Sequence, residues 1–190
     1  MAIQNVALIG AGIMGAGVAR NILKGGYEVA VFDINPEAVA ALAADGARAA
    51  SSAADAGRDA DIAITVLPAP VHLEAAVFGE DGLAETLREG VILVQQSTID
   101  PAAVVDLARR LEPQGVRVLD APMLRNPAAA AAGTLGFVIG GDADALAEAA
   151  PIFDCMGEST EHLGPVGTGS ALKLVNNMLN IIMINSRMSN

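Results

Sequence analysis

Residues 6–15 read VALIGAGIMG, an apolar run that passes directly into three glycines with the spacing Gly10-x-Gly12-x-x-Gly15. In such a pattern the run forms a strand, the first glycine permits a tight turn, the second lets a phosphate approach the backbone, and the third lets the next helix pack on the strand. The first amides of that helix favour an anion. The residues expected at a dinucleotide pyrophosphate are Gly10, Gly12, Ile13, Met14 and Gly15.

A second apolar run ends in Val31-Phe32-Asp33. A carboxylate about 20 residues beyond the glycines, at the end of the second strand, binds both ribose hydroxyls and repels a 2′-phosphate. Glycines before helices are common, so the strand-helix-strand context and Asp33 are what make the pattern specific. We therefore expect NAD rather than NADP, although Asn35 could soften this choice and Asp33 could instead be a simple turn residue.

Short runs of Val, Ile and Leu alternate with alanine-rich amphipathic stretches along most of the chain. This alternation predicts a Rossmann-like, doubly wound α/β domain with a mostly parallel sheet. Strands are expected near Asn5–Gly10, Glu28–Asp33, Asp61–Leu67, Val91–Gln95, Val116–Asp120, Leu135–Ile139 and Thr160–Leu163. Helices are expected over Gly12–Lys24, Pro36–Ala44, Ser52–Ala56, Pro70–Phe78, Pro101–Leu111 and Asp142–Asp154.

The pattern changes after Gly164-Pro165 to one long helix, from Ser170 to about Met188, with apolar residues on most of its sides. A helix of this kind requires burial on most sides. We therefore expect residues 1–164 to form the nucleotide-binding domain and residues 165–190 to begin the interdomain helix of a helical C-terminal domain that is otherwise absent. That domain, a second subunit of a homo-oligomer, or both would cover the helix.

Lys173 and Asn177 lie on this helix with i, i+4 spacing. Residues so spaced share one helical face, with about 6 Å between their Cβ atoms. In a closed cleft beside an oxidised nicotinamide, desolvation and like charge would lower the pKa of the lysine, which makes it a usable acid or base near neutral pH. The residues alone leave open a solvated lysine with capping asparagines.

Composition excludes several classes of function. A net charge of -11 without a basic run argues against nucleic acid, whose binding depends on basic patches. A single cysteine, Cys155, excludes an intramolecular disulfide framework and a cysteine metal cluster, and it favours a reducing compartment, hence the cytoplasm. We find no export signal or membrane span. Neither His72 nor His162 has a carboxylate at triad or metal spacing, so we expect both to be structural and no metal to be required.

Together these segments resemble the β-hydroxyacid dehydrogenase family, which includes 3-hydroxyisobutyrate dehydrogenase and tartronate semialdehyde reductase. The resemblance covers essentially the whole chain and rests on the glycine fingerprint, Asn21-Ile-Leu-Lys-x-Gly, Val66-Leu67-Pro68, Ser97-Thr98-Ile99, Asp120-Ala121-Pro122, Gly133-Thr134-Leu135 and Gly167-x-Gly169-x-x-x-Lys173-x-x-Asn176-Asn177. It implies that Lys173 is the catalytic acid/base and that Asn177 orients the substrate. It also implies that Leu67, Pro68 and Thr98 line the cofactor cleft.

One segment departs from the family. After Asp-Ala-Pro the family usually has x-Ser-Gly-Gly, which holds the substrate carboxylate, whereas this chain has Met123, Leu124, Arg125 and Asn126. Leu124 cannot donate a side-chain hydrogen bond, but Arg125 carries a planar fork suited to carboxylate, phosphate or sulfonate, and Asn126 adds an amide. In this respect the chain looks closer to the branch that resembles sulfolactaldehyde reductase. Arg125 could also be an exposed loop residue.

The resemblance implies an NAD-dependent oxidoreductase that interconverts a small anionic β-hydroxy acid, or hydroxy-aldehyde, with its carbonyl form. Two alternatives remain. One is imine reduction on the same scaffold, which Lys173 disfavours because that branch commonly lacks the lysine. The other is a dimer-forming nucleotide-binding module without turnover, suggested by the absent domain and by Leu124 in place of serine.

Overall fold

The structure, a computed structural model, describes residues 3–188. The strands are β1 (Asn5–Ile9), β2 (Glu28–Phe32), β3 (Arg48–Ala49), β4 (Ile62–Thr65), β5 (Ile92–Gln95), β6 (Arg117–Asp120), β7 (Met123–Leu124), β8 (Leu135–Gly140) and β9 (Gly157–Gly164). The α-helices are α1 (Ile13–Lys24), α2 (Pro36–Ala44), α3 (Ala53–Gly57), α4 (Pro70–Phe78), α5 (Pro101–Leu111), α6 (Pro127–Ala132), α7 (Ala143–Met156) and α8 (Thr168–Met188). Two 3-10 helices cover Leu83–Glu85 and Glu112–Gln114.

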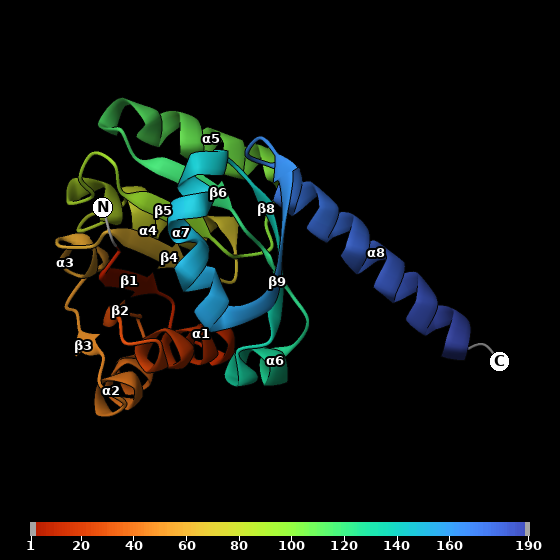
Figure 1. The fold of residues 1–190 in the computed structure, drawn as a ribbon, viewed down its shortest axis with the longest axis horizontal. Coiled ribbons are helices and arrows are strands. Elements are labelled where there is room, and N and C mark those ends of the chain that lie inside the picture. Colours follow the sequence, from red (N-terminus) through yellow and green to blue (C-terminus); the bar gives the residue numbers. More distant parts are fainter. Residues whose placement is uncertain (1–2, 189–190) are drawn as a thin grey trace.

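The strands form one sheet in the order β3-β2-β1-β4-β5-β6-β8-β7, and β9 pairs with β8 (Figure 1). The strands from β3 to β6 are parallel, while β8 runs antiparallel to β6 and β7. The strand order reverses at β1, which has β2 on one side and β4 on the other. In an open parallel sheet this reversal leaves a crevice at the carboxyl ends of the strands, where ligands bind.

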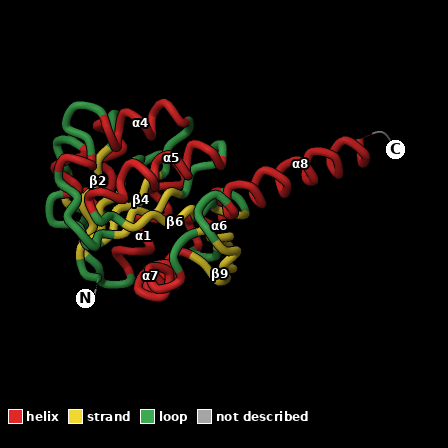
Figure 2. The backbone as a smooth tube through the Cα atoms, turned by 90° about the horizontal axis from the view of Figure 1, so that it is seen from above, coloured by secondary structure: helices red, strands yellow, loops and turns green. Residues whose placement is uncertain are grey.

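Helices cover both faces of the sheet, as the tube view shows with α4 and α5 on one side and α1 and α7 on the other (Figure 2). Alternate residues of β1 supply the two cores: Val6 and Leu8 pack with α1, α2 and α7, and Ala7 and Ile9 pack with α3, α4 and α5. Because a parallel sheet is buried on both faces, its strands are continuous apolar runs. The predicted doubly wound α/β architecture is confirmed.

The helix α8 leaves this compact body and projects away from it (Figures 1 and 2). Its first turns contact β8, α5 and β6. Farther along, the large apolar side chains are exposed, among them Leu174, Val175, Met178 and Leu179. The structure thus agrees with the prediction of an apolar helix that needs a cover. In the part of the chain that the structure describes, no helix meets the length and apolarity required to cross a membrane.

The expected elements are all present, with ends that differ by a few residues, and α8 begins at Thr168 rather than Ser170. Five elements were not predicted from the sequence, namely β3, β7, α6 and both 3-10 helices. Two-residue strands have no measurable periodicity. The signal for α6 was present, because Asn126 precedes Pro127 as an N-cap precedes a first-turn proline. We had interpreted that segment only as a substrate loop.

Candidate functional site

A cavity of about 1040 Å³ lies at the carboxyl ends of β1, β2, β4 and β5. One end is lined by the glycine turn and Asp33, and the other by Thr98, Arg125 and Lys173. Pockets of several hundred cubic ångströms accommodate cofactors and substrates. The sheet therefore brings together the two segments, far apart in sequence, that were predicted to bind a nucleotide and to transfer a proton.

The three fingerprint glycines differ in what a side chain at each position would meet. Gly10 has a φ of +101°, and a Cβ there would collide with the carbonyl oxygen of Val66. A Cβ on Gly15 would collide with the carbonyl oxygen of Gly10. A Cβ on Gly12, by contrast, would meet no described atom within 4 Å, because this glycine faces the open cavity.

The helix α1 begins directly after Gly12, and no side chain among residues 3–188 caps it. Its first turn also contains no acidic residue. The first amides of a helix have no partner within the helix, and together with the helix dipole they attract an anion. The open start of α1, next to a position where a Cβ has free space, fits the pyrophosphate of a dinucleotide.

Asp33 follows β2 and lines the cavity. Its carboxylate accepts hydrogen bonds from the amides of Ala11, at 2.6 Å, and Asn35, at 2.8 Å. These bonds hold it beside the glycine turn, at the position from which a carboxylate contacts an adenosine ribose. The next residue, Ile34, also lines the cavity and is 89% exposed, so it presents a bare apolar side chain beside Asp33.

A further group of residues on the cavity wall could not be recognised in the sequence. It comes from the start of α3 and from α4 with its following loop, and its members are Ser51, Ser52, Ala53, His72, Ala75, Ala76, Glu80 and Asp81. His72, which we expected to be structural, is one of the residues that line the cavity. No motif in the sequence marked these residues, because the wall forms only when α3 and α4 pack on the same face of the sheet.

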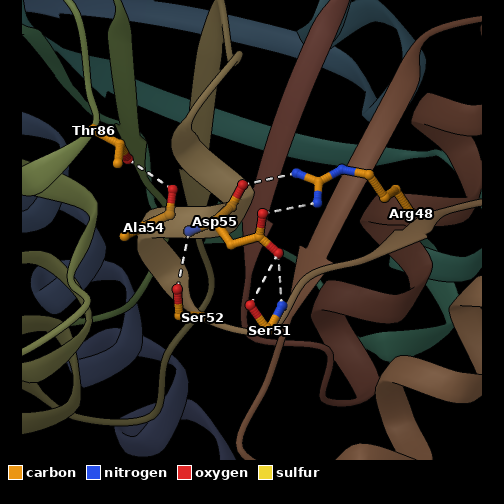
Figure 3. A network of polar contacts seen from close by, with 6 residues as sticks. All are labelled: Arg48, Ser51, Ser52, Ala54, Asp55 and Thr86. Atoms are coloured by element: carbon orange, nitrogen blue, oxygen red, sulfur yellow. Dashed lines mark hydrogen bonds and ion pairs between the residues drawn. The ribbon is translucent and has the colours of Figure 1, made fainter.

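A network around Asp55 fixes the start of α3 (Figure 3). Asp55 accepts hydrogen bonds from the amide of Ser51, at 2.8 Å, and pairs with Arg48, at 3.2 Å. The Ser52 hydroxyl accepts from the Asp55 amide at 3.0 Å, which caps the helix. The bond from the Ser51 amide, followed by the charge of Arg48, lowers the pKa of the Asp55 carboxyl. The sequence signal was a serine three residues before an acid, which is typical of a helix start.

Lys173 lies on the first turns of α8, lines the cavity, and is 8% exposed. Desolvation by burial lowers its pKa from the ordinary lysine value. A buried amine of this kind exchanges protons at a lower pH than a surface lysine. Leu67, Pro68 and Thr98, expected at the cofactor cleft, line the same cavity. The Ser97 hydroxyl accepts from the Leu67 amide at 2.8 Å and holds these two loops together.

Arg125 lines the cavity, and its backbone adopts a left-handed conformation with a φ of +79°. Its guanidinium donates to the carbonyl oxygen of Thr134, at 2.7 Å, and pairs with Glu158 on β9, at 2.5 Å. These two contacts hold the Arg125 guanidinium at the cavity wall. Met123 also lines the cavity.

Three predicted site residues do not line the cavity in this structure. Leu124 lies on β7, and the Asn126 side chain caps α6 by accepting from the Ala129 amide at 3.1 Å. Asn177 is half-buried one turn beyond Lys173 on α8. The helix continues away from the domain there, so a partner for that face would have to come from outside the described residues.

A family model described as the NAD binding domain of 6-phosphogluconate dehydrogenase matches residues 5–164. The NAD-dependent L-serine dehydrogenase of Pseudomonas aeruginosa is 43% identical over 181 residues, which cover 95% of this chain and 61% of the relative. The 3-hydroxyisobutyrate dehydrogenase of the same organism is 39% identical over 175 residues, which cover 92% of this chain and 59% of the relative.

A solved structure of Mycobacterium tuberculosis 3-hydroxyisobutyrate dehydrogenase with L-serine is 34% identical, with a TM-score of 0.86, and the match covers 93% of this chain and 60% of that one. The chain thus spans about 60% of the length of these relatives. The matches confirm the resemblance to the β-hydroxyacid dehydrogenases, and the chain belongs to the family of the NAD-binding domain of 6-phosphogluconate dehydrogenase.

Proposed function

We propose that this chain is the nucleotide-binding part of an NAD-dependent dehydrogenase that interconverts a small anionic β-hydroxy acid, or hydroxy-aldehyde, with its carbonyl form. The single observation that carries the proposal is the buried Lys173 in the same cavity as the open start of α1. Relatives named as L-serine and 3-hydroxyisobutyrate dehydrogenases support this class of substrate. The resemblance to a sulfolactaldehyde reductase-like branch stays a prediction.

Bound NAD would supply the hydride acceptor at its nicotinamide ring. The uncapped amides of α1 would hold its pyrophosphate, and Asp33 would accept hydrogen bonds from the ribose hydroxyls. The Asp33 carboxylate would repel a 2′-phosphate at the same place, which favours NAD over NADP. The backbone amide of Asn35 donates to this carboxylate, and its side chain is neutral, so Asn35 adds no charge that would attract a phosphate.

Lys173 transfers the proton. In the oxidative direction its neutral amine accepts the proton of the substrate hydroxyl while the carbon-oxygen double bond forms and the hydride leaves the carbon. In the reductive direction its ammonium returns a proton to the carbonyl oxygen as the hydride arrives. Burial lowers the pKa of Lys173, so the neutral form needed for oxidation is reached at a lower pH than for a surface lysine.

Arg125 would anchor the anionic end of the substrate through the N–H groups that its bonds to Thr134 and Glu158 leave free. A guanidinium can bind a carboxylate or sulfonate through two parallel hydrogen bonds. Leu124 offers no side-chain donor here, so the charge of Arg125 carries the recognition that a serine provides elsewhere in the family. Asn177 would orient the substrate from α8, and the exposed apolar side chains of α8 would meet a helical C-terminal domain and a second subunit.

The test compares Lys173→Ala with Lys24→Ala in the protein at its full encoded length, because Lys24 is the other lysine of this sequence and is exposed. NADH oxidation is followed with semialdehydes that carry a carboxylate or a sulfonate, and with uncharged aldehydes. Loss of the acid/base should lower kcat by about 10²-fold or more, while NADH affinity persists and Lys24→Ala stays active. Full turnover in Lys173→Ala, or a preference for uncharged aldehydes, would refute the assignment.

A further inference from the structure

The start of α8 is held by a carboxylate from the other side of the site. Asp120 is the last residue of β6 and its side chain is fully buried. Its two oxygens accept hydrogen bonds from the amide of Ser170, at 2.7 Å, and from the Ser170 hydroxyl, at 2.6 Å. The backbone amides of Gly167 and Gly169 also act on this carboxyl group, in the direction that lowers its pKa. The first turn of α8 thus donates its free amides to a single side chain of the sheet.

The backbones of α8 and the sheet are also in close contact at this point. A Cβ on Gly169 would lie 2.6 Å from the carbonyl oxygen of Val138, on β8, and would collide with the carbonyl oxygen of Asp120, on β6. A Cβ on Gly140 would lie 2.6 Å from the Thr168 hydroxyl. At Gly169 and Gly140 there is no room for even a Cβ, so the start of α8 packs directly against the backbones of the two strands.

This cap differs from the others in the molecule. Side chains cap α2, α3, α5, α6 and α7 from the residue directly before each helix. The acceptor for α8 is 50 residues away in sequence. A local cap stabilises a helix by itself, whereas a remote cap also fixes where the helix lies. Burial raises the pKa of the Asp120 carboxyl, and the hydrogen bonds from Ser170, Gly167 and Gly169 oppose that shift.

Lys173 lies three residues after Ser170, on the same side of α8. We propose that Asp120 is a positioning residue, which caps α8 from β6 and thereby sets the Lys173 amine at the cavity. Asp120 itself does not line the cavity, so it acts only through the helix. The proposal rests on the proposed function in that it takes Lys173 as the proton carrier. Proton transfer is sensitive to placement, since a displacement of about 1 Å can reduce a rate by about 10²-fold.

The test measures Lys173 directly. The sequence contains two lysines, so reductive ¹³C-methylation gives two lysine dimethylamine resonances beside that of the N-terminal amine. They can be titrated by NMR, with Lys24 as the internal reference and Lys173→Ala for assignment. In Asp120→Asn, one of the two side-chain acceptors becomes an NH₂ group that faces the Ser170 donors. We expect α8 to shift, Lys173 to gain water, and its pKa to rise toward the ordinary lysine value.

Ser170→Ala removes only the hydroxyl donor and tests the same cap if Asp120→Asn fails to fold. Ser170→Thr keeps the hydroxyl, so in this variant the pKa of Lys173 should equal that in the wild type. In the protein at its full encoded length, Asp120→Asn and Ser170→Ala should lower kcat by about tenfold or more, while the Kd for NADH changes by about twofold or less. This separation distinguishes positioning from a general loss of structure.

Asp142→Asn is the matched control, because Asp142 also caps a helix by accepting from the Ala145 amide, at 2.8 Å, but that helix is α7. It should reduce stability and leave Lys173 unchanged. Unchanged Lys173 titration and kcat in both Asp120→Asn and Ser170→Ala would overturn the proposal, and so would an equal effect of Asp142→Asn. Failure of the proposed function is a separate result, since it would appear as full turnover in Lys173→Ala.

Discussion

Two helices, α1 and α8, start at the edge of the sheet that forms the cavity. Their first turns differ, because one is open and the other is capped by a side chain. The start of α1 has no side-chain cap among the described residues and faces the cavity through Gly12. The start of α8 is closed by Asp120. Both helices have free amides that need an acceptor. In α1 these amides stay open toward the cavity, and in α8 a side chain of the sheet accepts from them.

Near each of the two helix starts lies a carboxylate from the end of a strand, Asp33 for α1 and Asp120 for α8. Asp33, after β2, accepts from the amide of Ala11, which precedes α1, and so it leaves the helix amides themselves free. Asp120 accepts from Ser170, inside the first turn of α8. A difference of a few residues in where the carboxylate binds separates an open helix start from a capped one.

Closing the start of α1 should have the largest effect. In Gly12→Asp the new side chain meets no described atom within 4 Å of its Cβ and can cap α1 as Asp120 caps α8. We expect a melting temperature equal to or above that of the wild type, because an N-cap aspartate stabilises a helix by about 1 kcal/mol. The carboxylate also occupies the pyrophosphate position, so the Kd for NADH should rise by about 10²-fold or more, about 3 kcal/mol.

NADH fluorescence titration and thermal unfolding measure the two quantities on one sample. Gly12→Asn is the control, since it caps the helix without a charge and should weaken NADH binding less. If Gly12→Asp bound NADH as tightly as the wild type, the open start of α1 would not be the pyrophosphate site.

The next largest effect concerns a feature that both helix starts have in common. In each, a glycine packs directly against the backbone of a strand or turn. A Cβ on Gly15 would collide with the carbonyl oxygen of Gly10, and a Cβ on Gly169 with that of Asp120. Overpacking of this kind costs about 1–3 kcal/mol. Gly15→Ala and Gly169→Ala should both lower the free energy of unfolding in urea by about 2 kcal/mol. Gly12→Ala, with free space around its Cβ, should not. Equal stability of all three variants would show that the helices can move away from the sheet at little cost.

The sequence predicted the start of α1 and could not predict that of α8. The strand, turn and helix of 6–15 are contiguous, so each glycine has a local reason that spacing alone reveals. The bonds from Ser170 to Asp120 join residues 50 positions apart. Both belong to segments that the family resemblance identified, but neither spacing nor composition pairs them. Only the placement of β6 beside β8 brings the two together.

The same limit explains the cavity walls. The fold class, Asp33 and the side of α8 that bears Lys173 follow from periodicity and position, and the structure places both residues in one cavity. The wall from α3 and α4 required knowing which helices share a face of the sheet. Asn126 was predicted to bind substrate, which stays a prediction, and the structure shows that its side chain caps α6. A polar residue before a proline supports either interpretation, and only the structure shows that a helix follows.

The smallest expected effect tests the carboxylate that leaves α1 open. Asp33→Ser removes a negative charge at the cavity wall and shortens the side chain, so the amide of Ala11 loses its acceptor. NADH should bind more weakly, because the ribose hydroxyls lose a partner, while NADPH should lose its repulsion from the 2′-phosphate. We expect the ratio of the two Kd values to shift toward NADPH by about tenfold, or 1.4 kcal/mol.

Glu37→Gln is the control, because it removes the same charge four residues later, on the exposed first turn of α2, and Glu37 does not line the cavity. If Glu37→Gln shifted the ratio as much as Asp33→Ser, the preference would arise from the net charge of the protein and not from contact at the ribose. A shift confined to Asp33→Ser would show that the two strand-end carboxylates have different roles. Asp33 would select the ligand at the start of α1, whereas Asp120 closes the start of α8.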